Sequence, residues 1–250
     1  ISIGPNELIE NAERDLYQIS EKGSASSGVQ TFTTAVEEAV ELAKKAFEKD
    51  SSVVGLSSHF RDLDNKLGGF HPSDLIIIAG RPSMGKTSLA TNIAFNIARD
   101  SHINNDSNSS ILFFSLEMSS EQLATRILSE QAKISSSDIR KGNLSENDLD
   151  NLVSVSKDIL EIPLYIDDTP AINVGSISSR ARKLKRKHGL GAIVIDYLQL
   201  VRPSKSSRNE TRVLEISDIT QSLKALAKEL NIPIIALSQL SRQVEQRDDK

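Results

Sequence analysis

The sequence is 250 residues long, with 30 lysines and arginines against 34 aspartates and glutamates, so its formal net charge is −4. The absence of cysteine excludes disulfide bridges, thiolate metal sites and thiol catalysis, and the four histidines lie far apart in the chain, without metal-ligand spacing. No run approaches the roughly 20 apolar residues of a membrane span, and nothing resembles a signal peptide. We therefore expect a cytoplasmic globular protein that is not basic all over, which is compatible with a local basic channel for nucleic acid.

The first part of the chain predicts two helices separated by a linker. Residues 6–20 carry apolar side chains at helical spacing, and residues 22–28 have the composition of a flexible linker. A second helix is expected to begin near Thr34, because Thr34 and Glu37 form the pattern of a capping box. Since the chain starts at Ile1 rather than methionine, we also expect it to be a fragment of a longer protein.

From residue 75 onward, short apolar runs alternate with longer segments of helical periodicity. The runs, which we predict as strands, are Leu75–Ala79, Ile111–Leu116, Leu164–Ile166, Ala192–Ile195 and Ile234–Leu237. The predicted helices cover residues 87–99, 120–132, 146–159, 174–188 and 213–230. This alternation predicts an α/β fold, a mainly parallel sheet with helices on both faces. The polar segments 102–110 and 203–212 are predicted to be mobile loops.

The segment from Gly80 to Thr87, GRPSMGKT, fits the phosphate-binding pattern GxxxxGK[ST]. A predicted strand precedes it and a predicted helix follows it, which disfavours the alternative of a glycine-rich turn with an incidental lysine. In this context backbone amides and the helix N-terminus bind phosphate. We predict that Lys86 reaches the β- and γ-phosphates and that the Thr87 hydroxyl is a ligand to Mg²⁺. The residues expected to contact ATP are Gly80, Arg81, Pro82, Ser83, Met84, Gly85, Lys86, Thr87 and Ser88.

Three other predicted strands end in polar side chains. Asp196 follows a buried run, the Walker-B arrangement that holds Mg²⁺. Glu117 could polarise an attacking water, since Ser119 and Gln122 already supply the cap of the next helix. Gln239 could sense the γ-phosphate. Each has an ordinary alternative as a cap, a loop residue or a turn residue. Because ligands in open α/β sheets bind at the carboxyl ends of strands, the convergence predicts Mg²⁺-dependent nucleoside triphosphate hydrolysis.

With these residues assembled, the sequence resembles the C-terminal motor domain of bacterial replicative DNA helicases of the DnaB type. The matching segments are residues 74–87, 114–118, 195–200, 222–230 and 236–242. The resemblance implies a RecA-like P-loop NTPase core over residues 29–250. It also implies that residues 1–28 form a linker helix, which docks on a neighbouring subunit, and a flexible linker.

The resemblance implies a homo-hexameric ring around single-stranded DNA, with ATP-driven 5′-to-3′ unwinding at the replication fork. A primase and a helicase loader are the implied protein partners. Among the residues, it implies catalytic roles for Lys86, Glu117 as the base and Gln239 as the γ-phosphate sensor. It also implies a Walker-B role for Asp196 and a nucleotide-site role for Arg126.

The sequence departs from the family pattern in two places. Ser58-His59 stands where the family usually has Thr-Gly. The family also continues past residue 250 with a DNA-contacting loop and an arginine finger. We therefore expect a motor domain truncated at its C-terminus, one that binds ATP but hydrolyses it weakly, because such a finger contributes about 10³–10⁵ in rate in related NTPases.

Two basic segments are candidates for DNA contact. The run at residues 180–188 lies on a predicted helix with an apolar face, so its charges are interpreted as the solvated side of that helix. The segment after the Walker-B strand is the stronger candidate, and Lys205, Arg208 and Arg212 are predicted to meet DNA phosphates without reading sequence.

Other functions compatible with the sequence are a filament-forming RecA-like recombination or repair ATPase, a P-loop small-molecule kinase, and a fragment that acts only in assembly. The quoted segments favour the helicase over the recombination ATPase. The kinase is disfavoured because neither an arginine-bearing lid nor an acceptor pocket is recognisable.

Overall fold

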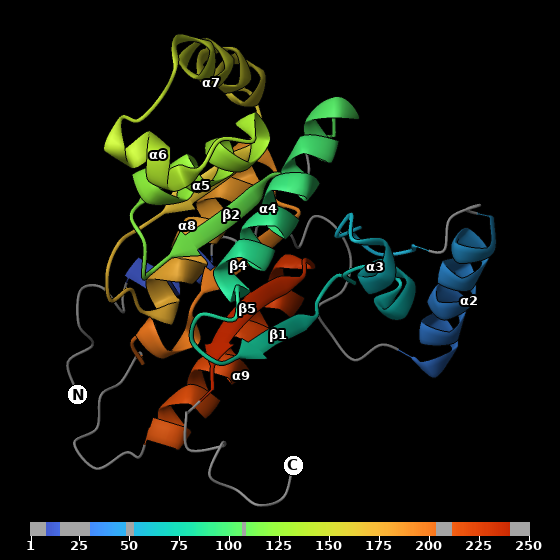
Figure 1. The fold of residues 1–250 in the computed structure, drawn as a ribbon. Helices are drawn as coiled ribbons and strands as arrows, with labels where there is room; N and C mark the ends of the chain where they lie inside the picture. The colour runs from blue at the N-terminus through green and yellow to red at the C-terminus, as the bar shows by residue number, and fades with distance from the viewer. Residues whose placement is uncertain (1–8, 16–30, 49–52, 107–108, 204–211, 241–250) are drawn as a thin grey trace, which may run out of the picture.

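The fold is built on a five-stranded parallel sheet (Figure 1). The computed structural model describes residues 9–15, 31–48, 53–106, 109–203 and 212–240. The strands lie in the order β1-β5-β4-β2-β3, and every pair is parallel. Their bounds are Leu75–Gly80 (β1), Ile111–Ser115 (β2), Leu164–Asp167 (β3), Ala192–Asp196 (β4) and Ile234–Gln239 (β5). The predicted parallel sheet is confirmed, with each strand end within two residues of its expected position.

Helices connect the strands, as parallel pairing requires. Their bounds are Phe32–Glu48 (α2), Arg61–Leu67 (α3), Lys86–Ile103 (α4), Ser120–Ala132 (α5), Ser136–Lys141 (α6), Glu146–Ile159 (α7), Val174–His188 (α8) and Arg212–Leu230 (α9), with a 3₁₀ turn at Leu198–Leu200 (η1). The helices predicted after residue 75 are all present. Sequence periodicity missed α3, α6 and η1, because segments of three to seven residues are too short to show a 3.6-residue repeat.

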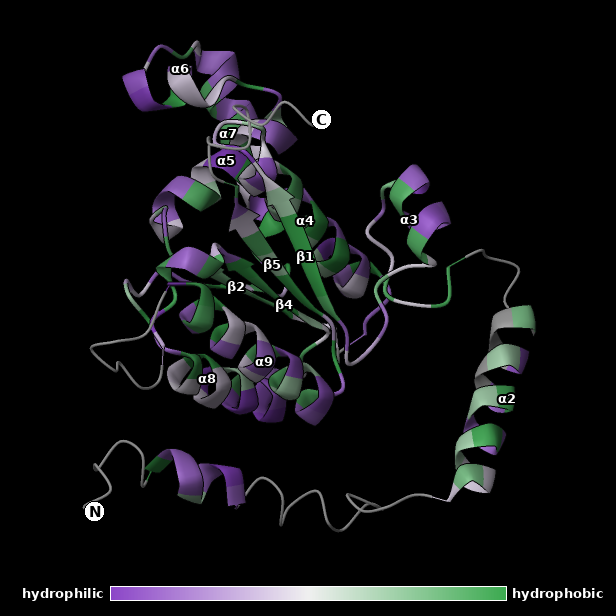
Figure 2. Ribbon diagram, turned by 90° about the horizontal axis from the view of Figure 1, so that it is seen from below, coloured by the Kyte–Doolittle hydropathy of each residue, from purple (hydrophilic) through white to green (hydrophobic). Residues whose placement is uncertain are grey.

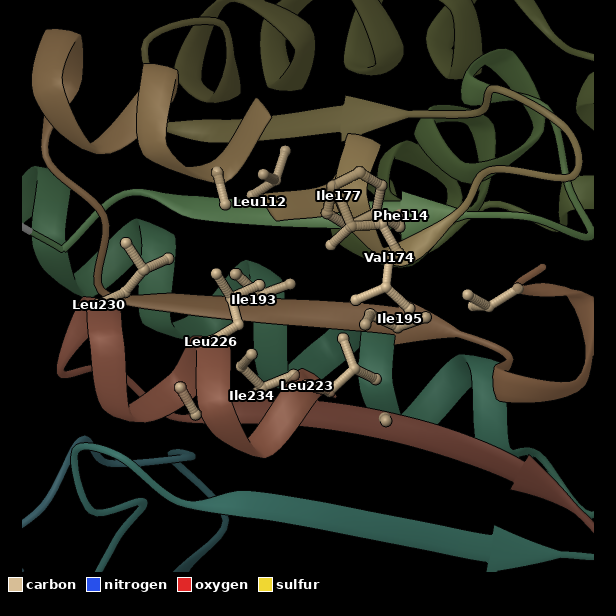
Figure 3. Close-up of a cluster of buried hydrophobic side chains, with 14 of the residues drawn as sticks. Leu112, Phe114, Val174, Ile177, Ile193, Ile195, Leu223, Leu226, Leu230 and Ile234 are labelled. Atoms are coloured by element: carbon tan, nitrogen blue, oxygen red, sulfur yellow. The ribbon is translucent and has the colours of Figure 1, made fainter. Parts of the chain in front are cut away.

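Alternate residues of the central strands face two separate cores. Phe114 and Ile195 lie in the core beneath α8 and α9 (Figure 3), together with Leu223 of α9. Phe113 lies in the other core, with Ile93 of α4 and other apolar side chains. Figure 2 shows the hydrophobic strands between the two helical layers. Burial on both faces explains why these strands read as continuous apolar runs, and it confirms the predicted helices on both sides.

The N-terminal predictions need correction. Helix α2 begins at Phe32, within two residues of the predicted start near Thr34, but its cap is Thr31 rather than Thr34: the Thr31 Oγ1 accepts the backbone N–H of Thr34 at 3.3 Å. Of the helix predicted at 6–20, residues 9–15 are helical, and the rest lies outside the described residues, as does the predicted linker at 22–28.

Part of the polar segment predicted as a loop at 102–110 is helical. Helix α4 continues to Ile103, and the Ser101 hydroxyl donates to the carbonyl of Asp106 at 2.7 Å. Residues 107–108 lie outside the described residues. A local side-chain hydrogen bond of this kind orders a turn without any apolar contact, which is why composition alone did not reveal it.

Ser58 and His59, where the sequence departs from the family pattern, lie in a loop that is hydrogen-bonded to Asp64. Ser58 is buried, and both its hydroxyl and its backbone N–H donate to Oδ1 of Asp64, at 2.7 and 2.8 Å. Burial raises the pKa of Asp64, but hydrogen bonds from Ser57, Ser58 and His59 bring that pKa below its usual range. The loop is therefore organised around a buried carboxylate, and Ser58 supplies two of its donors.

None of the helices in the described ranges combines the length and the apolar character that a membrane span requires.

Candidate nucleotide site

The register of the sheet aligns the carboxyl ends of neighbouring strands at one edge. Gly80 at the end of β1 pairs with Gln239 at the end of β5, and Ser115 of β2 pairs with Asp196 of β4. Glu117 follows Ser115 by two residues. The sequence-predicted side chains from four strands therefore leave the sheet at one edge, as the topology rule for open α/β sheets requires.

A pocket of about 380 Å³ opens at this edge. It is lined by Pro82, Ser83, Gly85, Lys86, Thr87, Ser88, Glu117, Arg126, Asp196, Tyr197 and Gln239. Of the residues expected to contact ATP, Gly80, Arg81 and Met84 do not line it. Tyr197 was missed by the sequence analysis, and its position directly after the Walker-B aspartate was the signal that could have revealed it.

A larger cavity, of about 470 Å³, lies at the opposite, amino-terminal ends of the strands. Its walls include Val54, Leu190 and Ile232, and the ionisable residue among the lining residues is Lys185. The Lys185 ammonium already donates to the carbonyl of Leu230 at 2.6 Å. The described lining of this cavity contains no carboxylate, whereas the smaller pocket combines Glu117 and Asp196 with Lys86, so we take the smaller pocket as the candidate site.

The phosphate-binding loop has the backbone that its sequence predicts. Gly85 adopts a left-handed conformation (φ +81°), which favours glycine, directly before the first residue of α4, Lys86. At Gly80 a Cβ atom would lie 3.2 Å from Cδ of Lys86, so glycine leaves room for the lysine stem. The Lys86 ammonium donates to the carbonyl of Arg81 at 2.8 Å, within the loop. A compact loop with its lysine at the pocket wall follows from these two glycines.

Asp196 is a buried carboxylate in the wall of the pocket. Its side chain is 2% exposed at the end of β4. Burial is the largest influence on the pKa of Asp196 and raises it, and the charge of Glu117 raises it further. The Thr87 side chain and the charges of Lys86 and Arg126 lower the pKa, but it remains above the usual range of an aspartate. A carboxylate in this position is costly to keep ionised unless a cation compensates it.

The donor set fits Mg²⁺. Oδ2 of Asp196 is buried and has no hydrogen-bond partner in the described part of the chain, and the Thr87 hydroxyl lies close enough to the same carboxylate to lower its pKa. The described residues contain no cluster of three or more histidine, aspartate or glutamate side chains that could hold a metal. Mg²⁺ is commonly held by one or two protein oxygens together with substrate phosphates and water, so a full protein cage is not required.

Substitution of Asp196 by asparagine is expected to stabilise the magnesium-free protein at neutral pH while impairing Mg²⁺-dependent ATP turnover. A folded-state pKa above the unfolded value means that the native protein loses stability as pH rises from about 4 through that pKa. Thermal melts of both proteins in EDTA across pH 4–8 measure this effect. The variant should melt a few degrees higher at pH 7, and the difference should shrink toward pH 4. A wild-type protein that is more stable than Asp196→Asn at pH 7 would contradict the assignment.

Glu117 is not needed as a helix cap. Ser119 caps α5: its hydroxyl accepts the backbone N–H of Gln122 at 3.3 Å, and its own N–H donates to the Gln122 side chain at 3.2 Å. Arg126, further along α5, donates to the Ser88 hydroxyl at 3.3 Å across the pocket. The loop before α5 thus presents Glu117 to the pocket, and α5 contributes a cation to the same wall.

Of the three residues predicted to contact DNA phosphates, only Arg212 lies in the described part of the chain. Lys205 and Arg208 lie outside the described residues. Arg212 begins α9 and is exposed, but its guanidinium donates to the Glu215 carboxylate and to the backbone carbonyl of Gln199.

On α8, part of the basic run is engaged within the chain. Arg180 pairs with Asp167, and Arg182 forms a two-pronged ion pair with Glu229 at 2.6 and 3.1 Å. Lys185 holds the carbonyl of Leu230. These contacts, and the buried face of α8, favour the structural interpretation of this run over DNA contact.

The comparisons with known proteins agree with this geometry. The DnaB-like helicase C-terminal domain family matches residues 55–250. The replicative DNA helicase DnaB of Rickettsia typhi is 49% identical over 254 residues, an alignment that covers 100% of this chain and 51% of that protein. The chain thus spans about half the length of the curated relatives that it matches.

Two solved structures are also similar. One, an ATPase domain, has a TM-score of 0.75 at 34% identity, covering 85% of this chain and 73% of that one. The other, a DnaB-like replicative helicase described with its interactions with primase, has a TM-score of 0.74 at 32% identity, covering 96% of this chain and 55% of that one. Since the family match extends over most of the chain and the fold is that of the RecA-like helicase ATPase domains, the chain belongs to the DnaB-like helicase C-terminal domain family.

Proposed function

We propose that this chain is the ATP-hydrolysing motor of a bacterial replicative DNA helicase, which moves 5′-to-3′ along one DNA strand and separates the duplex. The observation that carries the proposal is one pocket that gathers a phosphate-binding loop, two carboxylates and a glutamine from four strand ends, in a chain of the DnaB-like family. The proposal extends to the full-length protein, acting in the cytoplasm.

Each pocket residue has a role in this proposal. Lys86 and the loop amides bind the β- and γ-phosphates, and Ser88 and Arg126 complete the nucleotide wall. Thr87 and Asp196 would hold Mg²⁺, which supplies charge neutralisation for the phosphates when bound. Glu117 orients the attacking water and accepts its proton, and Gln239 donates to the γ-phosphate. An arginine finger from a neighbouring subunit, implied by the family resemblance, would stabilise the developing charge.

The proposal includes a homo-hexameric ring, and the exposed face of α2 supports contact between subunits. Phe32 and Phe47 are 84% and 91% exposed, and Val36 and Val40, also exposed, follow Phe32 at helical spacing. α2 stands away from the sheet in Figures 1 and 2. An apolar stripe of this size on a helix is typical of an interface. The helix at residues 9–15, which the sequence predicts as the docking linker, is hydrogen-bonded to α8 of the same chain through Glu13 and Ser179, and its docking on a neighbouring subunit stays a prediction.

Single-stranded DNA, a primase and a helicase loader are the proposed partners. Arg212 is the described candidate for phosphate contact, and the related helicase whose structure was described with primase supports that pairing by family resemblance. Contacts of arginine and lysine with phosphates are salt-sensitive and independent of sequence.

The decisive experiment is ATP turnover by the full-length protein with and without single-stranded DNA. We expect turnover to rise when poly(dT) is added, and the stimulation to weaken as salt increases. The proposal would be overturned if poly(dT) left turnover unchanged while a small metabolite stimulated it, because that result would indicate a kinase. Electron microscopy with ATP should show closed rings, whereas open filaments would indicate a recombination-type ATPase.

A further inference from the structure

Gln199 lies in η1, between the Walker-B strand and the segment that leads to α9, and η1 packs against both β5 and α9. Gln199 does not line the nucleotide pocket. Its side chain nevertheless pairs with the backbone at the end of β5. Its amide nitrogen donates to the carbonyl of Gln239 at 3.2 Å, and its amide oxygen accepts the N–H of Gln239, also at 3.2 Å. The same nitrogen donates to the Ser238 hydroxyl at 3.0 Å.

These bonds fix the backbone of Gln239, the residue through which β5 reaches the pocket. A carboxamide that pairs with both the N–H and the C=O of one residue restrains how that residue can rotate, so the orientation of Gln239 depends on Gln199. The next residue, Leu240, donates its N–H to the carbonyl of Gly80 at 3.1 Å, at the start of the phosphate-binding loop. The end of β5 is therefore tied to the phosphate-binding loop on one side and to Gln199 on the other.

The backbone carbonyl of Gln199 makes a separate contact, with Arg212 at the start of α9. The remaining described partner of this guanidinium is Glu215, in an ion pair of 2.5 Å whose arginine side chain is 49% exposed. Exposed ion pairs contribute little energy, and a DNA phosphate can compete for such an arginine. Movement of Arg212 toward DNA would release the Gln199 carbonyl and loosen η1 against β5.

We propose that Gln199 is a positioning residue that couples the γ-phosphate side of the nucleotide pocket to Arg212, its side chain orienting Gln239 and its carbonyl holding the arginine. This inference rests on the proposed helicase function, because it identifies Arg212 as a DNA contact. Coupling between the two binding events is reciprocal: ATP alters the affinity for DNA by the same free energy by which DNA alters the affinity for ATP. DNA at Arg212 also alters ATP turnover, through the orientation of Gln239.

The test uses the full-length protein and the variant Gln199→Met, which keeps the size of the side chain and removes its hydrogen bonds. We measure kcat and KM for ATP with and without poly(dT), and the affinity for a fluorescent oligo(dT) with and without a non-hydrolysable ATP analogue. We expect KM for ATP to change little, because Gln199 lies outside the pocket. DNA stimulation of kcat should fall roughly fivefold or more, and the effect of the ATP analogue on oligo(dT) affinity should fall with it.

Two further variants keep the test decisive. Gln221→Met makes the same chemical change at an exposed glutamine on α9 and should retain wild-type stimulation. Gln199→Glu is nearly isosteric and keeps the acceptor for the Gln239 N–H, but it replaces the donor to the Gln239 carbonyl by a carboxylate oxygen that repels it, so it should also lose stimulation. If Gln199→Met does not fold, the glutamate variant decides alone.

Wild-type stimulation in the Gln199 variants would overturn the coupling role, as would a loss that merely parallels weaker ATP binding. A wild-type protein without any DNA stimulation is a separate outcome, since it would contradict the proposed function itself.

Discussion

Replacement of Lys86 by alanine is expected to abolish ATP-dependent DNA unwinding by the full-length protein and to lower ATP turnover by at least about 10²-fold. Lys86 is the first residue of α4, at the wall of the pocket, and its Nζ lies within the loop that would surround the phosphates. Its ammonium is the charge that meets the β- and γ-phosphates, and alanine keeps the helix but removes this charge.

The matched control for this prediction is Lys183→Ala, at an exposed lysine on α8 that does not line the pocket. The control should unwind DNA as the wild type does, and both variants should melt at a temperature near that of the wild type. Unwinding that survives in Lys86→Ala would remove the phosphate-binding loop from the proposed mechanism.

The second large effect is expected at Glu117. Glu117→Gln should still bind ATP, because the phosphate-binding loop and α4 are untouched, but steady-state turnover should fall by about 10²–10⁴-fold. The amide has nearly the shape of the carboxylate and cannot accept a proton from the attacking water. Nucleotide affinity and turnover, measured side by side, separate this effect from a loss of binding.

Glu121→Gln is the control, since Glu121 is an exposed glutamate in the first turn of α5 and does not line the pocket. It should turn over ATP at the wild-type rate. Unchanged turnover in Glu117→Gln would exclude Glu117 as the base, and the water would then need another residue to activate it.

The sheet could be predicted from sequence because its central strands are buried on both faces. Phe113 and Phe114 point into opposite cores, so an unbroken apolar run was the only pattern that such a strand could show. The phosphate-binding loop was predictable for a different reason, because its function requires glycine at fixed positions. Gly85 adopts a left-handed backbone conformation that residues other than glycine rarely adopt.

Other features depended on contacts between residues distant in sequence. The side-chain amide of Gln199 contacts Gln239 only because β4 and β5 are neighbours in the sheet, and no local sequence pattern around either residue predicts this contact. Tyr197 lines the pocket through the turn that follows β4. The cap of α2 was assigned to Thr34 instead of Thr31 because both threonines are suitable caps, and sequence alone does not rank them.

The most direct test of the central claim is an experimental structure of the full-length protein with Mg²⁺ and a non-hydrolysable ATP analogue. We expect the γ-phosphate to lie within contact distance of Lys86 and Gln239, the metal to be held by Thr87 and through Asp196, and Glu117 to face the γ-phosphate. A triphosphate bound elsewhere, or Asp196 and Glu117 remote from it, would contradict the account.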